Sequence, residues 1–276
     1  MMETVKEKII EHAQSLGAGF VGFAPVARWA EFNEVQNDFR PDAIWPQAKT
    51  VIVIGVPMLL PILETTPSIY YSELYNTSNR LLDEIGYRLA MYLNRQGHAA
   101  TFFPRDAYGD IKVLVDNPNA AFSHVFAAKY AGLGTIGYNH TLLNPEYGPR
   151  IRYVSVFTAA LLPGDPVITK DLCIQCWLCQ RLCPSQAFTT REDNIIAAMD
   201  KEACARHHSL LREEHRYPCG ICIKVCPVGQ DRKLYQSTGG KVYLDEPGAI
   251  AENPEDPRYR NLVHVRKYGS KGDRIY

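Results

Sequence analysis

The chain has 276 residues, and its 30 lysine and arginine residues balance 30 aspartate and glutamate residues. This balance gives no electrostatic case for nucleic acid or membrane binding, and no apolar run approaches the roughly 18 residues of a spanning helix. The length predicts one or two domains, and the 46% hydrophobic content is ordinary for a globular protein with a sizeable core. No secretory signal is recognisable, so we expect a cytoplasmic protein.

The first part of the chain alternates between helical and strand patterns. Apolar residues at helical spacing predict a helix from Val5 to Leu16, and Phe20–Pro25 predicts a short strand. The β-branched run Thr50–Val56 predicts a central strand buried on both faces. Further along, we expect a long helix over 76–96, a strand over 98–103, a helix capped by Ser123 over 124–130 and an alternating strand over 151–157.

All eight cysteines fall between positions 173 and 226. The first four read Cys173-x2-Cys176-x2-Cys179-x3-Cys183-Pro184, which is the bacterial two-cluster ferredoxin pattern, whose fourth cysteine binds the other cluster. One [4Fe–4S] cluster is therefore expected to take Cys173, Cys176, Cys179 and Cys226. The second is expected to take Cys183, Cys219, Cys222 and, by elimination, Cys204. Cys204 must come from a longer loop, because Arg216 stands where a standard second motif begins with cysteine.

Two other uses of eight cysteines compete with clusters. Two zinc sites would consume the same number, but zinc ribbons use separated pairs rather than three cysteines in seven residues followed by Cys-Pro. Disulfides are disfavoured, because clustered thiols without a signal peptide suit a reducing compartment. The sequence therefore predicts a protein that carries two [4Fe–4S] clusters and moves single electrons.

Three segments follow from these patterns. We expect residues 1–165 to form an α/β domain that binds cofactor and substrate, and 166–236 to form a ferredoxin-like domain with two clusters. Residues 237–276, which show prolines, charges and little periodicity, are expected to be a tail that wraps the body. A free ferredoxin needs only its cluster domain, so the larger domain predicts that the clusters feed electrons to something bound there.

Residues 131–137 read Ala-Gly-Leu-Gly-Thr-Ile-Gly, which matches the dinucleotide fingerprint G-x-G-x-x-G. That fingerprint must follow a strand and open a helix, whereas here a helix precedes it. Two interpretations remain. The glycines serve tight turns without a ligand, or they line a loop that lets a flat cofactor approach the backbone. We favour the second.

The stretch from His124 to Arg150, with this glycine loop and Pro-Glu-Tyr-Gly-Pro-Arg at its end, looks like the corresponding stretch of epoxyqueuosine reductases and respiratory reductive dehalogenases. The cysteine order, including the isolated Cys204, resembles theirs too, so the resemblance covers about residues 116–229. It implies an α+β chain, with a nitroreductase-like α/β domain of cobalamin-binding type beside a two-cluster ferredoxin-like domain. In such proteins the clusters reduce cobalt to a low-valent nucleophile. The cofactor-binding residues that it implies are Gly132, Leu133, Gly134, Thr135, Ile136, Gly137, Asn139, His140 and Tyr147.

The sequence also departs from the family pattern. Tyr138 stands where epoxyqueuosine reductases carry a lysine, and Asp116, in Val-Asp-Asn-Pro, only resembles the V-D-[ST]-x-P context of their proposed general acid. We take these two residues as the catalytic candidates. Asp116 could instead cap a turn before Pro118, and Tyr138 could pack over the cofactor or core. Arg105, Lys112 and Arg150 could meet cofactor amides or a phosphate, or be ordinary solvated charges.

The sequence therefore predicts an iron–sulfur oxidoreductase that resembles epoxyqueuosine reductase, in a short form without the C-terminal tRNA-binding repeats. It would pass electrons through two clusters to a cobalamin that reduces a small-molecule or nucleoside-type substrate. One alternative is an electron-transfer or activator protein that reduces a corrinoid or flavin on a partner. Another is a flavin enzyme, since nitroreductase-like folds often carry FMN. The expected partners are an external donor such as ferredoxin or flavodoxin, a small-molecule substrate and a corrinoid protein, without membrane or nucleic acid.

Overall fold

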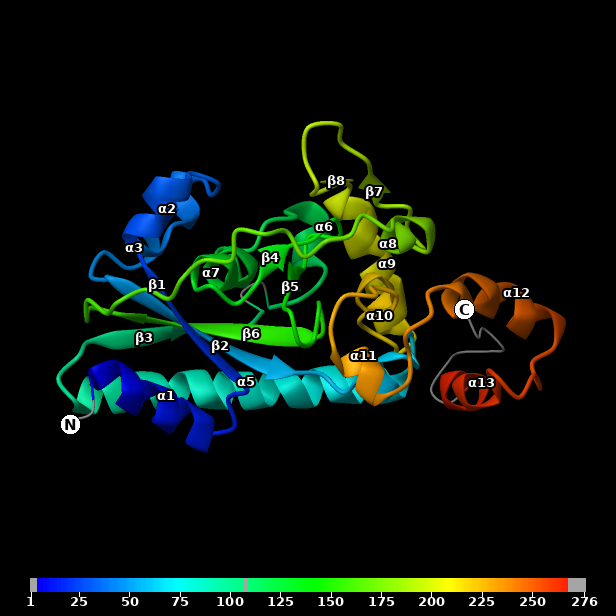
Figure 1. Ribbon diagram of the computed structural model, residues 1–276, viewed down its shortest axis with the longest axis horizontal. Helices are drawn as coiled ribbons and strands as arrows, with labels where there is room; N and C mark the ends of the chain where they lie inside the picture. Colours follow the sequence, from blue (N-terminus) through cyan, green and yellow to red (C-terminus); the bar gives the residue numbers. More distant parts are fainter. Residues whose placement is uncertain (1–3, 107–108, 268–276) are drawn as a thin grey trace.

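The computed structural model describes residues 4–106 and 109–267, with a four-stranded sheet at the centre of the larger part of the molecule (Figure 1). The strands lie in the order β1-β2-β6-β3, and every neighbouring pair runs antiparallel. In that order their bounds are Phe20–Pro25, Thr50–Pro57, Ile151–Thr158 and Ala100–Phe103. β2 is central and almost wholly buried, as its β-branched run predicts. β6 is nearly as buried, because strands flank it and helices cover both faces.

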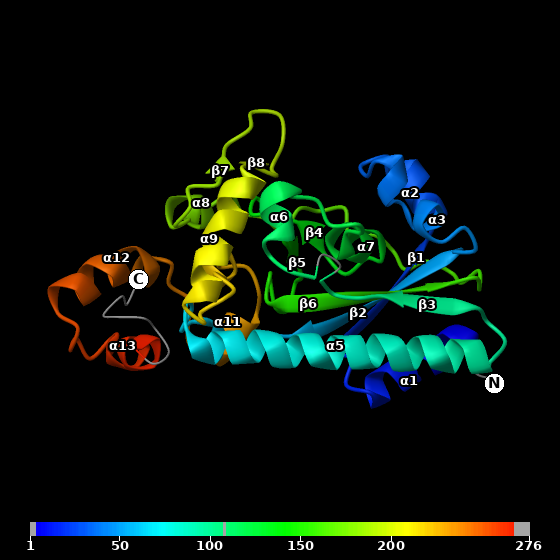
Figure 2. The ribbon, with the colours of Figure 1, turned by 180° about the vertical axis from the view of Figure 1, so that it is seen from behind.

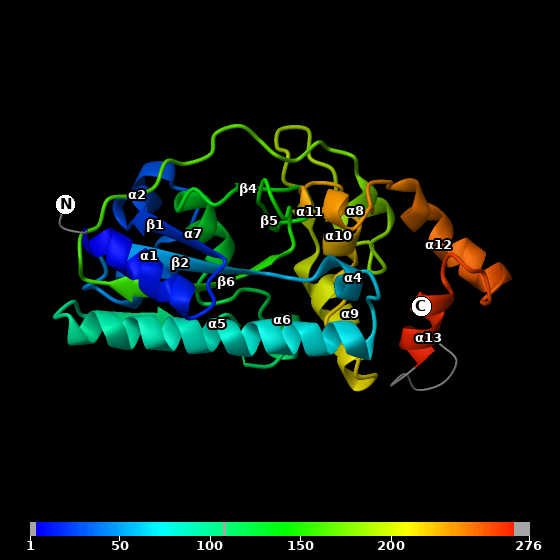
Figure 3. The same cartoon turned by 60° about the horizontal axis from the view of Figure 1, so that its bottom comes forward.

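Helices cover the two faces of this sheet. α1 (Val5–Ser15) and α5 (Ile69–Arg95) lie on one face, as Figures 1 and 3 show, and α7 (His124–Tyr130) lies on the other. Leu82, Ile85 and Leu89 of α5 join one buried core with Ile52 and Val156 of the sheet. The residues of the second core include Trp29, Val51, Val53, Ala127, Tyr130 and Phe157.

The long helix begins earlier than its apolar stripe indicates. α5 starts at Ile69, not near residue 76, because Ser68 caps it and its hydroxyl accepts a hydrogen bond from the Tyr71 N–H. Tyr71 and Tyr75 therefore lie in the first turns of α5 and point toward the cysteine region, where both line a cavity. The helix thus reaches from beneath the sheet to beneath the candidate site (Figure 2).

Short elements connect these layers. They are α2 (Ala27–Phe32), the 3-10 helix η1 (Asn37–Phe39) and α3 (Pro41–Ile44) between β1 and β2, α4 (Leu60–Leu63) before α5, and α6 (Val113–Asp116) before α7. The glycine loop contains β4 (Thr135–Ile136), which pairs antiparallel with β5 (Leu142–Leu143) to form a hairpin.

The cysteine region lies against one end of the sheet and is built mainly of short elements. They are α8 (Leu178–Arg181), the paired strands β7 (Phe188–Thr189) and β8 (Ala198–Met199), α9 (Lys201–Glu213), α10 (Ile221–Lys224) and α11 (Asp231–Leu234). Short pieces suit a chain that must turn repeatedly to bring cysteines together.

The described part of the tail is largely helical, which corrects the expectation of an aperiodic segment. α12 (Lys241–Glu252) and α13 (Arg260–Lys267) stand at the cysteine end of the molecule and do not wrap the sheet domain (Figures 1 and 2). Ile250, Tyr259 and Val263 form a small core between the two helices. Residues 268–276 of the predicted tail lie outside the described residues. Across the described ranges, none of the helices has the length and apolar character needed to span a bilayer.

Candidate functional site

The eight cysteines form two groups in space. The first cysteine group lines one small cavity and consists of Cys173, Cys176, Cys179 and Cys226. Cys173 and Cys176 lie in the loop before α8, Cys179 lies in the first turn of α8, and Cys226 follows α10. The backbone at Gln175 and Trp177 is left-handed, with φ of 52° and 54°, which coils this loop tightly between its cysteines.

The second cysteine group lines a larger cavity of about 390 Å³ and consists of Cys183, Cys204, Cys219 and Cys222. Cys204 reaches it from α9, a helix that the sequence did not predict, and so replaces the cysteine that a standard motif would have near Arg216. This partition is the one that the ferredoxin pattern predicts. Ligation of iron by these thiols stays a prediction.

The electrostatics of both groups fit thiolates that a metal cluster stabilises. Burial, together with a smaller effect of neighbouring cysteines, raises the pKa of Cys179 and of Cys219 to about 12. Burial likewise raises the pKa of Cys204 and Cys226 to about 11, although Arg150 opposes the shift at Cys226. Thiols that resist ionisation in this way need adjacent positive charge, and the irons of a [4Fe–4S] cluster supply it.

A second cavity, of about 480 Å³, adjoins the cavity of the second cysteine group. We call the two together the central cavity. Both are lined by Pro118, Thr141, Arg152, Lys201 and Ile223. The central cavity therefore runs from the second cysteine group, past β6, to the first turn of α7. Its size and its mixture of apolar walls with a few polar groups are typical of small-molecule and cofactor sites.

The predicted glycine loop packs on the chain itself. A Cβ added to Gly132 would lie 2.2 Å from the carbonyl oxygen of Pro166, and one added to Gly134 would lie 2.0 Å from that of Leu143. At Gly137 the Leu143 side chain occupies the space, 2.8 Å away. The close approach that these glycines allow is therefore to the protein's own chain, and the packing gives no support to a cofactor lying beside them.

The other predicted cofactor residues divide between core and cavity. Leu133 and Ile136 pack in the core, Thr135 Oγ1 accepts a hydrogen bond from the Leu172 N–H, and Tyr147 packs edge-on against Phe20. Only Asn139 and His140 of the predicted set line the central cavity. These two residues are the part of the loop that a bound molecule could reach.

Asn139 stands between the two cysteine groups, because it lines the cavities of both. Its Nδ2 donates to the Cys222 carbonyl oxygen over 3.0 Å, and its Oδ1 accepts from the Thr141 hydroxyl over 2.7 Å. His140 Nε2 lies 2.8 Å from the Ala197 carbonyl oxygen, and burial lowers the pKa of this imidazole. Asn139 therefore fixes the backbone of one proposed ligand while it faces the central cavity.

Neither catalytic candidate forms part of the described wall of the central cavity. Asp116 is exposed at the end of α6, although Leu114 and Pro118 on either side line the cavity. Tyr138 is buried beside the first cysteine group, and its hydroxyl lies 2.9 Å from the Thr190 hydroxyl. Tyr138 thus packs in the core, which is the alternative that the sequence left open, and its catalytic role stays a prediction.

The three basic residues predicted to meet a cofactor or phosphate lie in different surroundings. Arg105 lines the central cavity and pairs with Asp83, and Lys112 is exposed. Arg150 neither meets a cofactor nor lies in solvent. It is fully buried and pairs with Asp231. The sequence did not show this, because the partner lies 81 positions away.

Several residues that line the cavity were not predicted from the sequence. Arg152 donates to the Tyr75 hydroxyl and to Asp106, and its guanidinium lies 4.4 Å from the Tyr75 ring centroid. Tyr153 lines the cavity and is 7% exposed, and its hydroxyl has no hydrogen-bond partner among the described residues. An arginine beside a tyrosine in an otherwise apolar strand was the signal that could have identified them.

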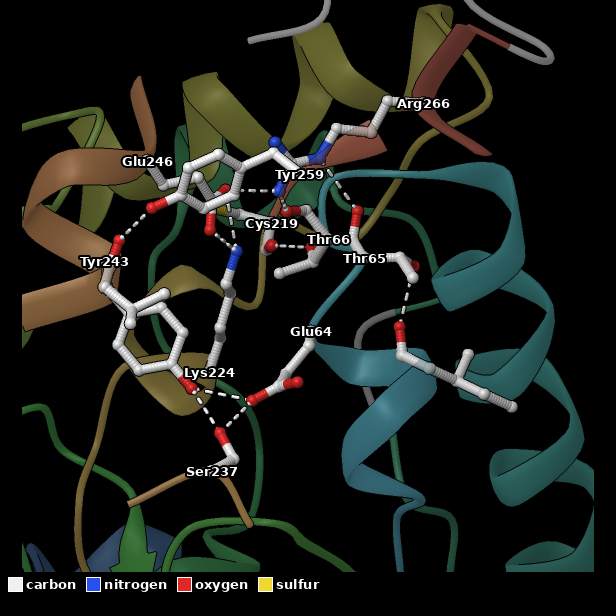
Figure 4. Close-up of polar contacts among 12 residues, drawn as sticks. Glu64, Thr65, Thr66, Cys219, Lys224, Ser237, Tyr243, Glu246, Tyr259 and Arg266 are labelled. Carbon is white, nitrogen blue, oxygen red and sulfur yellow. Dashed lines mark hydrogen bonds and ion pairs between the residues drawn. The ribbon is translucent and has the colours of Figure 1, made fainter. Parts of the chain in front are cut away.

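A buried ion triad joins the cysteine region to the C-terminal helices (Figure 4). Lys224 of α10 donates to both carboxylate oxygens of Glu246 on α12, at 2.9 and 2.7 Å. Arg266 of α13 donates to Glu246 at 2.7 Å and to the carbonyl oxygens of Thr65 and Thr66. Burial opposes ionisation of Glu246, but the two cations hold its pKa below the usual value. The triad therefore fixes α10, which contains Cys222 and ends two residues before Cys226, to the C-terminal helices.

Comparisons with known proteins relate this site to two groups of reductases. Residues 172–230 match the family model described as a 4Fe-4S dicluster domain. A tetrachloroethene reductive dehalogenase of Desulfitobacterium hafniense is 25% identical over 210 residues, which cover 68% of this chain and 35% of that protein. An epoxyqueuosine reductase of Bacillus cereus is 22% identical over 254 residues, which cover 82% of this chain and 64% of that one. The chain thus spans about a third of the length of the dehalogenases it matches.

Solved structures agree on the fold. The catabolic reductive dehalogenase NpRdhA superposes with a TM-score of 0.64 at 24% identity, over 93% of this chain and 37% of that chain. An epoxyqueuosine reductase solved with a tRNA stem loop superposes with a TM-score of 0.55 at 18% identity, over 81% of this chain and 64% of that chain. The mixed α/β fold, the 4Fe–4S domain and both groups of relatives lead to one conclusion. The chain is related to the iron–sulfur oxidoreductases known as epoxyqueuosine reductases and reductive dehalogenases.

Proposed function

We propose that this protein is a reductase that passes electrons through two [4Fe–4S] clusters to a cofactor in the central cavity, and that this cofactor is cobalamin. The observation that carries the proposal is that all four cysteines of the second group line the central cavity. A cluster held there would lie directly beside whatever the cavity binds. The proposal includes a nitroreductase-like fold of cobalamin-binding type for residues 1–165, a cluster domain at 166–236 and a tail from 237.

The order of electron transfer follows from the same arrangement. The first cysteine group does not line the central cavity, and Asn139 lies between the two groups. Electrons would therefore enter at the first cluster, pass to the second and leave into the cavity. Asn139 holds the Cys222 backbone, and the cysteines hold the irons.

The residues of the central cavity suit a corrinoid, whose rim carries many amide groups. Polar atoms come from Asn139, His140, Thr141 and Lys201. The Tyr153 hydroxyl, for which the described residues provide no hydrogen-bond partner, lies in the wall of the same cavity. When bound, cobalamin would supply a low-valent cobalt as the reductant of a small-molecule or nucleoside-type substrate. FMN is the second cofactor that we consider for this cavity. Asp116 remains a proposed proton donor because α6 borders the cavity, and Tyr138 remains one by resemblance alone.

One observation favours a second candidate function. Neither proposed proton donor forms part of the cavity wall described above. A protein that only transfers electrons to a corrinoid or flavin on a partner would need no such donor. The alternative is therefore an electron-transfer or activator protein without substrate chemistry of its own.

The test is anaerobic reconstitution of the full chain with iron and sulfide, then incubation with cobalamin or FMN and gel filtration. We expect about eight irons per chain, a broad cluster absorbance and cobalt that stays with the protein. Clusters without retained cobalt or flavin, together with reduction of a corrinoid protein, would favour the activator. Failure to assemble two clusters would reject both candidates.

A further inference from the structure

We infer that the loop over the first cysteine group is the docking surface for a small acidic protein that carries one electron at a time. This surface, the entry loop, comprises residues 173–177 and presents Ile174 and Trp177. The inference rests on the proposed function, because a docked carrier needs a cluster beneath it. It adds where the external donor binds and which chemistry that donor must have.

Large apolar side chains stand in solvent on this loop. Ile174 is 66% exposed and Trp177 is 45% exposed, although both sit among the cysteines of the first group. The left-handed backbone at Gln175 and Trp177 shapes the loop at a cost in conformational energy, because non-glycine residues disfavour it. Adjacent exposed apolar residues that are held in place in this way are typical of a protein interface.

The entry loop is also the route to the clusters that avoids the substrate cavity. Cys173 and Cys176 are partly exposed within it, and neither of them lines the central cavity. A carrier at the central cavity would compete with cofactor and substrate for the same opening. A carrier at the entry loop would reach the first cluster while the cavity stays closed to it.

The charges around the entry loop select an acidic partner. Lys170 precedes the first cysteine by three positions, Arg181 ends α8, and Gly240 packs on Leu178, which brings Lys241 close to α8. Segment 170–181 alone carries two exposed cations, Lys170 and Arg181, against one exposed acid, Asp171, and Lys241 adds a third cation close to α8. The whole chain is neutral, so this local excess of positive charge would steer an acidic carrier.

The redox step at this surface balances without further reactants. One electron leaves the reduced iron–sulfur or flavin centre of the carrier, which is thereby oxidised by one electron. The first cluster takes up that electron and passes from its 2+ to its 1+ state. No covalent bond forms or breaks, and no proton is required.

The experiment uses the reconstituted full chain and stopped-flow absorbance under anaerobic conditions. The reductants are a reduced plant-type [2Fe–2S] ferredoxin, which is acidic, and dithionite, which needs no protein surface. One variant combines Arg181→Glu with Lys241→Glu, and a second combines Ile174→Ser with Trp177→Ser. The matched controls are Arg95→Glu and Leu161→Ser. Arg95 is the last residue of α5, at the end of that helix that lies away from the cysteine region (Figure 1), and Leu161 is 79% exposed.

We expect the charge variant to lower the second-order rate constant with ferredoxin about tenfold at low salt, and added salt to slow the parent in the same way. The apolar variant should lower the same constant at all salt concentrations. Dithionite should reduce every variant at the parent rate, and the controls should match the parent throughout.

Equal ferredoxin rates in all four variants, with intact clusters, would overturn the docking surface and leave the proposed function standing. An equal loss with dithionite would also overturn it, because the loop would then act on the cluster and not on the carrier. Absence of clusters in the parent would instead reject the proposed function. The exposed positions of the charge variant keep the test available even where the tryptophan change impairs folding.

Discussion

Arg150 and Asp231 form a two-armed ion pair that is closed to solvent, with 0% and 3% of their side chains exposed. Arg150 Nε and Nη2 each lie 2.6 Å from a carboxylate oxygen of Asp231. The same guanidinium donates to the carbonyl oxygens of Cys226 and Val228. A residue next to β6 of the sheet domain thereby fixes the last cysteine of the first group, so the two parts of the chain depend on each other at this point.

Replacing Asp231 by asparagine should destabilise the protein strongly. The change leaves the Arg150 guanidinium buried without a counter-charge, which costs on the order of 3 kcal/mol in the free energy of unfolding. Urea unfolding measures it. The control is Asp193→Asn, because Asp193 pairs with Arg191 in solvent and its loss should have no measurable effect. Equal stability of the two variants would contradict the importance of the buried pair.

Cysteine substitutions should remove clusters according to the spatial groups and not according to the order in the sequence. Cys226→Ser should lose the same cluster as Cys173→Ser, although the two positions lie far apart in the chain. Cys204→Ser should lose the other cluster. Iron content should fall by about half in each variant, and electron paramagnetic resonance of the reduced protein should distinguish the two halves. A Cys204→Ser protein with both clusters intact would refute the assignment of the second group.

Glu246→Gln should loosen the C-terminal helices. Without the carboxylate, Lys224 and Arg266 remain buried as neighbouring cations, at a cost of about 3 kcal/mol in the free energy of unfolding. The matched control is Glu252→Gln, on the exposed side of the same helix, which should behave like the parent. Limited proteolysis of α12 and α13 measures the loosening. Resistance equal to that of the control would show that the triad does not hold these helices.

Tyr153→Phe should stabilise the cofactor-free protein while weakening retention of the cofactor. The Tyr153 hydroxyl is buried without a described partner, so its removal should raise the free energy of unfolding by about 1 kcal/mol. Tyr130→Phe serves as the contrast, because the Tyr130 hydroxyl donates to Glu34 and its loss should destabilise. Equilibrium unfolding and cobalamin retention on gel filtration measure the two effects. Unchanged retention would remove Tyr153 from the proposed site.

The stability of the fold should fall as the pH drops from about 6.5 toward 4, in part through His124. Its ring nitrogens lie 2.9 Å from the Ser155 hydroxyl and from the Pro104 carbonyl oxygen. The pKa of His124 is lowered to about 4, mainly by burial and to a lesser extent by Arg152, while Pro104 and Asp106 oppose the shift. The unfolded chain therefore binds a proton that the folded chain refuses, so this contribution is complete above pH 6.5 and is lost on acidification.

His124→Gln should reduce that loss of stability, because glutamine does not take up a proton. Unfolding by urea at pH 7.5 and at pH 5.5 measures the difference. The variant should keep part of the pH dependence, because the pKa values of His140, His207 and His208 are also lowered. The free energy of unfolding should nevertheless fall less between pH 7.5 and pH 5.5 in the variant than in the parent. An identical loss of stability in parent and variant would show that His124 takes up its proton equally in the folded and the unfolded state.

The local elements of the sheet domain were largely predictable because their signals are local. A β-branched run specified β2, and Ser123 with an apolar pattern specified α7. The start of α5 was missed because it depends on Ser68 and on tyrosines whose burial comes from the cysteine region, not from helical periodicity. α9 and the C-terminal helices were missed because their polar sequences become helical by packing on distant partners.

The candidate site shows the same division. Spacing assigned seven cysteines to the two groups that the structure brings together, because ligand swapping is a property of the motif, and Cys204 was assigned by elimination. The spacing of glycines does not reveal whether a ligand or the protein's own chain fills the space beside them, and the structure places Leu143 beside Gly137. The cofactor role of the loop stays a prediction. Arg152 and Tyr153 were invisible as cavity residues, because their surroundings come from α5, α6 and α7.

α5 also sets the distance between the sheet domain and the second cysteine group, because it packs against both. At its first turn the Tyr71 ring fills the space beside Gly220, where an added Cβ would lie 2.6 Å from the ring, and at its middle Leu82 and Leu89 enter the core of the sheet domain. One residue inserted between these points would turn Tyr71 by about 100° and shift it by about 1.5 Å along the axis. The spacing along α5 therefore sets where Gly220, and with it the second cysteine group, lies relative to the core of the sheet domain.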